Sequence, residues 1–421
     1  MRLILSLCLV LVLWRTPCPA AQATIGWWQF WTDPEIKPTI NAIVAEFQRQ
    51  NPDIEVIVTD LTWANGHEKI AIAFASGSAP DVVELGSDWI AQFAASGHLA
   101  DLTDSVTPRL EEYHGWSMAT YQGRIYAQPW ILGTRVLFLN RQLLSKAGYN
   151  KDFLPVSWAQ LEEAARKVKS LPIGVYGWGS NTAEKHRLYK KFMPFFWSSG
   201  AHVLSDDGRY CVVSAQSAVD ALKFYKRLHD CCGYVADQRG IEEAFLEGKV
   251  GMIISGDWLL KRIELEKREI DFATSMIPGP DPAVNLSRPS APMLRSTPYP
   301  GRSFGGGEFL AINAASANKD AALKLIQFVA SPENQVSFCK ANRSANPSSL
   351  QAQLDRYFQD NLYLQTFIKQ LNLSEHPPVD PDWVYMEAEI EKAVEEVLFH
   401  DSLPGQTLYR LQKSITELRR K

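Results

Sequence analysis

The stretch Glu242–Leu260, EEAFLEGKVGMIISGDWLL, constrains the fold more than any other part of the chain. Its first residues have the pattern of an amphipathic helix end, and Gly248 stands where helix C-termini commonly need a positive φ. Lys249–Ser255 carries a nearly continuous apolar run, which is typical of a strand buried on both faces of an α/β sheet. A glycine then allows a tight turn, and Asp257 is a good N-cap for a helix that begins at Trp258. The pattern therefore places a large aromatic residue just beyond the carboxyl end of a buried strand, where open α/β sheets bind ligands.

Related patterns of a strand that ends at an aromatic residue occur elsewhere in the chain. The apolar run Val82–Leu85 leads into Gly86–Trp89, and a later strand ends at Trp178. A first strand over Thr24–Trp31 also ends in aromatic residues and, with the helix and the strand Ile54–Val58 that follow, predicts a parallel β-α-β unit. Each of these aromatic side chains either packs the start of its helix or faces a ligand cleft, and the pattern alone leaves both readings open.

The N-terminus predicts export from the cytoplasm. Met1-Arg2 is followed by an apolar run too short to span a bilayer, and Ala21-Gln22-Ala23 has the form of a signal-peptidase site. We expect residues 1–23 to be a cleaved signal peptide and the mature protein to be soluble in the periplasm. Lipidation at Cys18, which would anchor the protein to the membrane, is the alternative, although the preceding Arg15-Thr16-Pro17 is a poor context for it.

Composition and motifs argue against several classes of function. The net charge of -4 disfavours non-specific binding of nucleic acid. The chain lacks the HExxH and GxSxG motifs, and its 8 histidines are scattered, so we expect no metal site and no cofactor. The 13 tryptophans favour a ligand with flat, semi-polar faces. A secreted glycoside-processing enzyme stays a minor alternative, because two catalytic carboxylates need only be close in space.

Four cysteines follow the predicted signal peptide, and an exported protein can form disulfides. Since a short helical segment separates Cys211 from the adjacent pair, we expect Cys211 to form a disulfide with either Cys231 or Cys232.

Several segments together resemble the extracellular solute-binding proteins of bacterial ABC importers, in particular the sugar-binding group that includes maltose-binding protein. They occur in the family's order and span nearly the whole mature chain. The segments are GSAPDVV (77–83), YQGRIYAQP (121–129), LNRQLLSKAGY (139–149), VSWAQLEEAA (156–165), FMPFFWSSGAHVLSDDG (192–208), AFLEGKVGMIISGDW (244–258) and SFGGGEFLAINAASANKDAALKLIQFVASPENQ (303–335).

The resemblance implies an α/β fold of the type II periplasmic-binding-protein kind, with two lobes that are each a mostly parallel sheet flanked by helices. It implies that the lobes close on a ligand by hinge motion. The protein would be a monomer that catalyses nothing and delivers its ligand to the transmembrane permease subunits of an importer driven by a cytoplasmic ATPase. The implied division is an N-terminal lobe of 24–131 plus 305–340, a C-terminal lobe of 135–300 plus 346–421, and hinge segments at 130–135, 300–305 and 341–346.

The resemblance also implies a set of ligand-binding residues. Trp258 and Trp383 match sugar-stacking tryptophans, and we expect both to be replaceable by alanine without loss of the fold. Asp88 matches a polar ligand contact, whereas Leu85 stands where maltose-binding protein has a stacking tryptophan. The ligand is therefore expected to be a mono- or oligosaccharide that need not be a maltodextrin. The full predicted set is Trp28, Gln29, Trp31, Asp88, Trp130, Trp178, Trp258, Gly305 and Trp383.

A phosphorylated ligand is the alternative within the same class of binding protein. Arg135, Arg302 and the glycine backbone at 305–307 are suited to an anion such as glycerol-3-phosphate or a phosphodiester. A surplus of positive charge in the binding site would favour this alternative over a neutral sugar.

Overall fold

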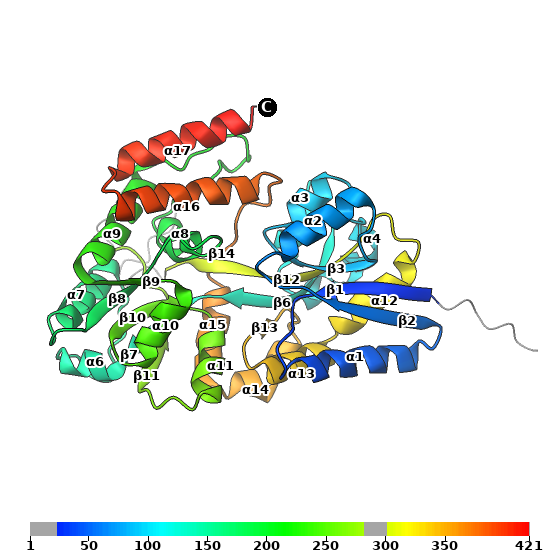
Figure 1. The fold of residues 1–421 in the computed structure, drawn as a ribbon, viewed down its shortest axis with the longest axis horizontal. Helices are drawn as coiled ribbons and strands as arrows, with labels where there is room; N and C mark the ends of the chain where they lie inside the picture. Colours follow the sequence, from blue (N-terminus) through cyan, green and yellow to red (C-terminus); the bar gives the residue numbers. More distant parts are fainter. Residues whose placement is uncertain (1–22, 282–300, 421) are drawn as a thin grey trace, which may run out of the picture.

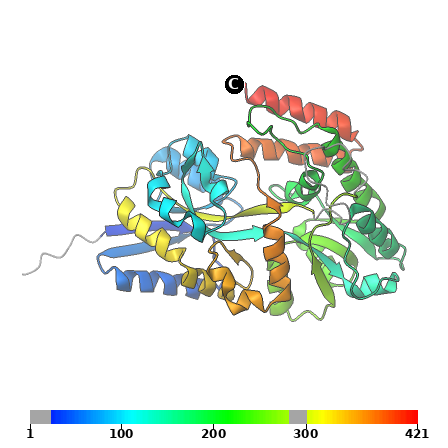
Figure 2. The same cartoon turned by 180° about the vertical axis from the view of Figure 1, so that it is seen from behind.

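The computed structural model describes residues 23–281 and 301–420, which form an α/β fold of two lobes (Figure 1). Residues 1–22 of the predicted signal peptide, including Cys18, lie outside the described residues, as does most of the segment between Pro278 and Gly301. Each lobe has its own sheet with helices on both faces, and the two sheets lie side by side in both views (Figure 2).

The first sheet has seven strands in the order β13-β6-β12-β3-β1-β2, with β14 paired to β12. The neighbours β2, β1 and β3 are parallel, as the predicted β-α-β unit requires, whereas β12 runs antiparallel to both β3 and β6. The strands are β1 (Ala23–Gln29), β2 (Ile54–Asp60), β3 (Val82–Gly86), β6 (Ala127–Thr134), β12 (Ser303–Ile312), β13 (Asn346–Pro347) and β14 (Ser374–Glu375). The helices packed around this sheet include α1 (Lys37–Gln50), α2 (Gly66–Ser76), α3 (Ile90–Ala95), α12 (Lys319–Val329) and α13 (Pro332–Asn342).

The second sheet has five strands in the order β11-β7-β10-β8-β9. It also mixes parallel and antiparallel pairs, because β7 enters from the first lobe and pairs antiparallel with β10 and β11. Its strands are β7 (Val136–Asn140), β8 (Tyr176–Asn181), β9 (Gly233–Ala236), β10 (Val250–Ser255) and β11 (Phe272–Ser275). The helices of this lobe include α6 (Arg141–Lys146), α7 (Trp158–Lys169), α8 (Leu188–Ser198), α9 (Gln216–Cys232), α10 (Gln238–Leu246), α11 (Trp258–Leu265), α16 (Trp383–Phe399) and α17 (Pro404–Leu418).

Shorter elements complete the described chain. Only Arg135 separates β6 of the first sheet from β7 of the second, so the chain passes between the lobes at that residue. The remaining elements are α4 (Thr103–Val106), the 3-10 turn η1 (Thr107–Glu112), α5 (Trp116–Ala119), the hairpin of β4 (Thr120–Tyr121) and β5 (Arg124–Ile125), η3 (Ala352–Leu354), α14 (Arg356–Gln359) and α15 (Leu362–Leu371).

The stretch Glu242–Leu260 forms the predicted helix end, buried strand and following helix, which are α10, β10 and α11. Helix α10 ends at Leu246, Gly248 has φ +74°, and all six residues of β10 are buried. Helix α11 begins at Trp258, as predicted, but the Asp257 side chain makes no capping hydrogen bond. Its Oδ2 instead accepts a hydrogen bond of 3.2 Å from Nδ2 of Asn346, which belongs to the first sheet. The carboxylate is therefore turned from its own helix toward the other lobe.

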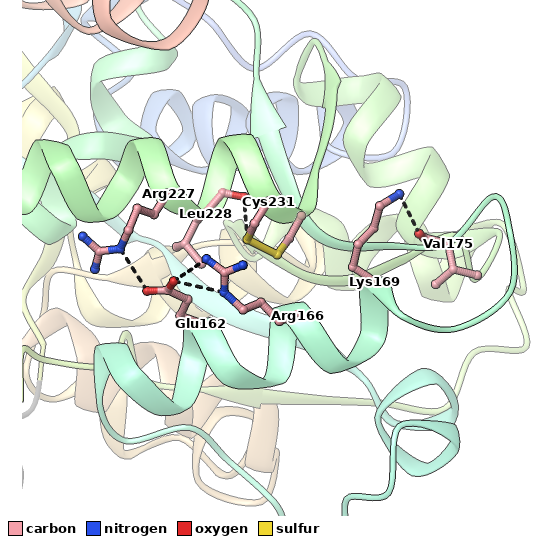
Figure 3. The surroundings of a disulfide bond; sticks show 8 residues. Glu162, Arg166, Lys169, Val175, Arg227, Leu228 and Cys231 are labelled. Carbon is pink, nitrogen blue, oxygen red and sulfur yellow. Dashed lines mark hydrogen bonds and ion pairs between the residues drawn. A yellow bond between two sulfur atoms is a disulfide. The ribbon is translucent and has the colours of Figure 1, made fainter. Parts of the chain in front are cut away.

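The predicted disulfide of Cys211 is wrong. Cys231 and Cys232 form a disulfide with each other at the end of α9 (Figure 3). Cys211 is a buried free thiol. Cys211 precedes α9, and a helix of 17 residues is roughly 25 Å long. Disulfides require Cα atoms within about 7 Å of each other, so the helix itself keeps Cys211 away from the pair.

Candidate functional site

The carboxyl ends of β1, β2 and β3 lie at one edge of the first sheet, because these three strands are parallel neighbours. The predicted residues Trp28 and Gln29 end β1, and Trp31 follows it. Gln29 is fully buried: its Nε2 donates to Oδ1 of Asp60 at 2.5 Å, and its Oε1 accepts from the backbone N–H of Trp31 at 2.6 Å. Trp28 and Trp31 are half-buried at this edge.

Asp88, which follows β3, meets the second lobe directly. Its Oδ2 lies 3.6 Å from Nζ of Lys190 and 3.3 Å from the hydroxyl of Tyr189, both on α8. The Lys190 ammonium also lies 4.9 Å from the centre of the Phe304 ring on β12. Asp88, the predicted polar contact with the ligand, therefore lies where the two lobes touch.

Arg135 lies between two aromatic rings at the same interface. Its guanidinium is 5.5 Å from the Trp258 ring centre and 4.7 Å from the Phe304 ring centre. Such positions attract a cation electrostatically to the ring face. Burial lowers the pKa of Arg135 to about 10, so the guanidinium stays charged at neutral pH.

The Trp258 indole is held in place by the buried carboxylate of Glu242 on α10. Oε1 of Glu242 accepts 2.7 Å hydrogen bonds from Nε1 of Trp258 and from Oγ of Ser255, and it also accepts from the Gln238 amide. Oε2 lies 3.2 Å from Nη1 of Arg262. Because Glu242 is only 3% exposed, these donors replace the water that a carboxylate would otherwise require.

Carboxyl groups with raised pKa values add to the polar character of the interface. Burial raises the pKa of Asp257 to about 7, and burial together with repulsion from Asp257 raises the pKa of Glu308, on β12, to about 8. Burial also raises the pKa of Glu84 well above its ordinary value, although Glu84 accepts a hydrogen bond from the backbone of Phe30. We use the name interlobe cluster for Asp88, Arg135, Tyr189, Lys190, Asp257, Trp258, Phe304 and Glu308.

The sequence matches the family model of bacterial extracellular solute-binding proteins over residues 33–336. The chain belongs to this family. A putative binding protein of Brucella abortus is 25% identical over 361 residues, which is 82% of this chain and 81% of that relative.

Solved structures show the same fold. The sugar-binding protein MalE from Xanthomonas citri superposes with a TM-score of 0.80 at 23% identity, covering 94% of this chain and 97% of MalE. UgpB from Mycobacterium tuberculosis, in complex with glycerophosphocholine, has a TM-score of 0.77 at 22% identity, covering 94% and 98%. At these identities the structural similarity shows the fold of the solute-binding protein. It does not distinguish a sugar ligand from a glycerophosphodiester.

The structure brings only part of the predicted site together. Asp88 and Trp258 belong to the interlobe cluster, and Gly305 follows Phe304 on β12. Trp130 and Trp178 are 0% and 1% exposed, and both lie inside the hydrophobic cores of the lobes. Both residues lie within interior strands of their sheets, and their rings contact other aromatic rings of the core.

Trp383 is also 1% exposed, but it borders the interlobe cluster. Its ring packs edge-on against Tyr189 with 5.9 Å between ring centres. Its indole Nε1 is buried and has no hydrogen-bond partner within residues 23–281 and 301–420. Trp383 is therefore a core residue whose indole N–H lies unpaired beside the interlobe cluster.

Several residues of the interlobe cluster were not predicted as site residues. Tyr189, Lys190, Phe304 and Glu308 come from α8 and β12. The segment around Tyr189 reads as an aromatic, buried helix, and nothing in its pattern indicates that its first turn meets Asp88 of the other lobe. This contact depends on how one lobe packs against the other, which the sequence pattern does not show.

The described part of the chain, residues 23–281 and 301–420, offers neither a metal-binding group nor a membrane-spanning helix. No group of three His, Cys, Asp or Glu side chains there is arranged to hold a metal ion. Within the same residues, no helix combines the length and the apolar character needed to cross a membrane.

The raised pKa values of Asp257 and Glu308 predict that the solute-binding protein loses stability as pH rises. In the unfolded chain these groups ionise near their ordinary pKa of about 4. The folded state therefore holds more protons between about pH 4 and pH 8, and the free energy of unfolding should fall over that range and level off above it. We expect a loss on the order of 1–2 kcal/mol after solvent screening, measured by urea unfolding at several pH values.

The control for this pH dependence is the double variant Asp257→Asn/Glu308→Gln, which cannot ionise at these positions. Its stability should vary less between pH 5 and pH 8 than that of the unaltered chain. An equally steep pH profile in the double variant would show that other groups cause the loss.

Proposed function

We propose that this solute-binding protein captures a neutral sugar between its lobes and delivers it to the permease of an ABC importer. The observation that carries the proposal is the mixture of unpaired polar atoms and aromatic faces around the interlobe cluster. Among the described residues, the buried atoms Nε of Arg135, Nε1 of Trp383 and Oδ1 of Asn346 have no hydrogen-bond partner.

These three atoms suit hydroxyl groups. Two of them are donors and one is an acceptor, and a sugar hydroxyl can both accept and donate. Buried polar atoms are nearly always paired in native proteins, so each unpaired atom calls for a polar partner. The half-buried ring of Trp258 supplies a flat surface for the apolar C–H face of a sugar ring, worth about 1 kcal/mol beyond area burial.

The balance of charge supports a neutral ligand over a phosphorylated one. Asp88, Asp257 and Glu308 bring three carboxyl groups to the interlobe cluster, and Arg135 and Lys190 bring two cations. Lys190 is already beside Asp88, and the Arg135 charge lies over two aromatic rings. Arg302, the other candidate for an anion, is engaged by Glu375 at 2.9 Å. The cations that a phosphodiester would need are therefore already engaged by protein groups.

Membership of the family supports the remaining parts of the proposal. We propose an N-terminal lobe of 24–131 plus 305–340 and a C-terminal lobe of 135–300 plus 346–421, joined by hinges at 130–135, 300–305 and 341–346, with the short strands β13 and β14 of the last segment paired into the first sheet. The protein works as a monomer in the periplasm, after cleavage of residues 1–23, and catalyses no reaction. Sugar binding favours the closed arrangement of the lobes, which is the form that the permease receives.

Thermal unfolding of the chain from Thr24 onward, against sugars and glycerophosphodiesters, tests this proposal. A ligand at about 100 times its Kd adds about 2.7 kcal/mol of stability, which appears as a rise in Tm. We expect a rise with at least one neutral sugar and none with glycerol-3-phosphate or glycerophosphocholine. A rise only with the phosphorylated compounds would contradict the proposal and favour the alternative ligand.

A further inference from the structure

Three aromatic side chains follow the three parallel strands at the edge of the first sheet. Phe30 comes directly after β1, Trp63 comes three residues after β2, and Trp89 comes three residues after β3. Since β2, β1 and β3 are neighbours in that order, their carboxyl ends bring the three rings together. This edge is the part of an α/β sheet that binds ligands.

The three rings form one continuous group, which we call the aromatic platform. Trp63 stacks on Phe30 with 4.2 Å between ring centres and 19° between ring planes, and it lies 5.7 Å from Trp89. Gly66 makes room for this stack, because a Cβ at that position would lie 2.1 Å from the Phe30 ring. One face of Trp63 is therefore fixed against a ring that is itself 4% exposed.

Trp63 differs from the other two rings because it is 44% exposed. A single exposed apolar residue is common on protein surfaces and by itself indicates nothing. Here, however, the exposed indole is stacked on a buried ring and belongs to a row of aromatic rings. A rigid ring loses little conformational freedom when a ligand stacks on it, so it binds more tightly than a mobile one.

The aromatic platform lies on the side of the first lobe that meets the second lobe. Asp88, the residue before Trp89, contacts Lys190 and Tyr189 of α8. Asp33, three residues after Phe30, forms an ion pair of 2.7 Å with Lys261 of α11. The platform therefore adjoins the interlobe cluster and extends from it toward β2, the edge strand of the sheet.

We infer that Trp63 is the stacking surface for a second sugar ring, so that the ligand is an oligosaccharide of at least two rings. The inference rests on the proposed function and selects among its ligands. The ring that reaches Trp258 and the unpaired polar atoms occupies the interlobe cluster, and the next ring of the same chain lies over Trp63. A monosaccharide fills the cluster alone and leaves Trp63 in solvent.

Titration calorimetry with matched sugar series tests this inference. The probes are glucose, maltose and maltotriose; glucose, cellobiose and cellotriose; N-acetylglucosamine and diacetylchitobiose; and xylose and xylobiose. We expect one disaccharide or trisaccharide to bind the unaltered chain about tenfold or more tighter than its own monosaccharide. Trp63→Ala should remove most of that difference and change the affinity for the monosaccharide less than about twofold.

Two further variants separate stacking from general damage. Trp63→Phe keeps an aromatic face and should retain most of the oligosaccharide affinity. Tyr409→Ala removes a side chain that is 54% exposed on α17, away from the first lobe, and should change no affinity. Thermal unfolding of each variant shows whether it is folded at the temperature of the titration.

The possible outcomes distinguish this inference from the proposed function. Equal affinity for a monosaccharide and its oligomers, or an oligosaccharide affinity that Trp63→Ala leaves unchanged, would overturn the inference while the sugar-binding proposal stands. No binding of any of these sugars, or binding of glycerophosphocholine in their place, would overturn both.

Discussion

Replacing Trp258 with alanine is expected to weaken sugar binding by about 30- to 100-fold, which corresponds to about 2–3 kcal/mol. The indole provides the stacking face beside Arg135, and its loss removes both the apolar contact with the sugar ring and the surface on which the guanidinium rests. Because Trp258 is only half-buried, the variant should remain folded. Titration calorimetry measures the change, and Trp258→Phe should lose less because it keeps an aromatic ring.

Trp383→Ala, the other variant suggested by the resemblance, is expected to behave differently. Trp383 is 1% exposed and packs within the core of the second lobe, so its removal should cost about 3–5 kcal/mol of stability. The expectation that it leaves the fold intact is therefore revised. If Trp258→Ala bound the sugar as tightly as the unaltered chain, stacking on Trp258 would be contradicted whatever the result at position 383.

The second large effect concerns stability. Glu242→Ala should lower the free energy of unfolding by about 3–5 kcal/mol, because it leaves several buried donors without their acceptor. Nε1 of Trp258, Oγ of Ser255 and the Gln238 amide all donate to Oε1 of Glu242, and Arg262 would lose one of its partners. Urea unfolding measures the change as a shift in the midpoint at constant slope.

The matched control is Glu163→Ala, which removes a glutamate of the same lobe from an exposed ion pair with Lys167. The Glu163 side chain is 59% exposed, and such surface pairs contribute about 0–1 kcal/mol. Glu242→Gln should lie between the two variants, because its amide keeps one acceptor oxygen. Equal losses from Glu242→Ala and Glu163→Ala would contradict the role assigned to the buried carboxylate.

Local patterns in the sequence predict the elements around Glu242 well. The apolar run in β10, the positive φ of Gly248 and the helix start at Trp258 all follow from residue types within a few positions. The acceptor role of Glu242 does not follow from them. In the sequence Glu242 looks like an ordinary helix residue, and its partners Ser255 and Trp258 are 13 and 16 residues away. Packing of α10 against β10 brings them together.

The candidate site depends even more on tertiary arrangement. The contact of Asp88 with Lys190 joins residues 102 positions apart, on elements of two different lobes, and no periodicity in either segment indicates it. The sequence pattern also does not predict how deeply a tryptophan is buried. Trp130 lies within a strand and Trp258 follows one, yet Trp130 is in the core of the first lobe and Trp258 is at the interface between the lobes. The Cys211 prediction is wrong because it considered sequence separation without the length of α9.

The sequence pattern was sufficient to predict Trp63 as a ligand-binding residue. It follows the end of a parallel strand within three residues, as Trp89 does, and the same reasoning that selected Asp88 and Trp258 applies to it. The structure adds the stack on Phe30 and the exposed face, which make the residue a ligand surface in our account.

Titration of the mature chain with the sugar that raises Tm most, in parallel with glycerophosphocholine, tests the central claim most directly. We predict stoichiometric binding of one sugar molecule, weakened about 30-fold or more by Trp258→Ala, and no measurable binding of glycerophosphocholine. Binding of glycerophosphocholine with no sugar response, or sugar binding that Trp258→Ala leaves unchanged, would contradict capture of a neutral sugar at the interlobe cluster.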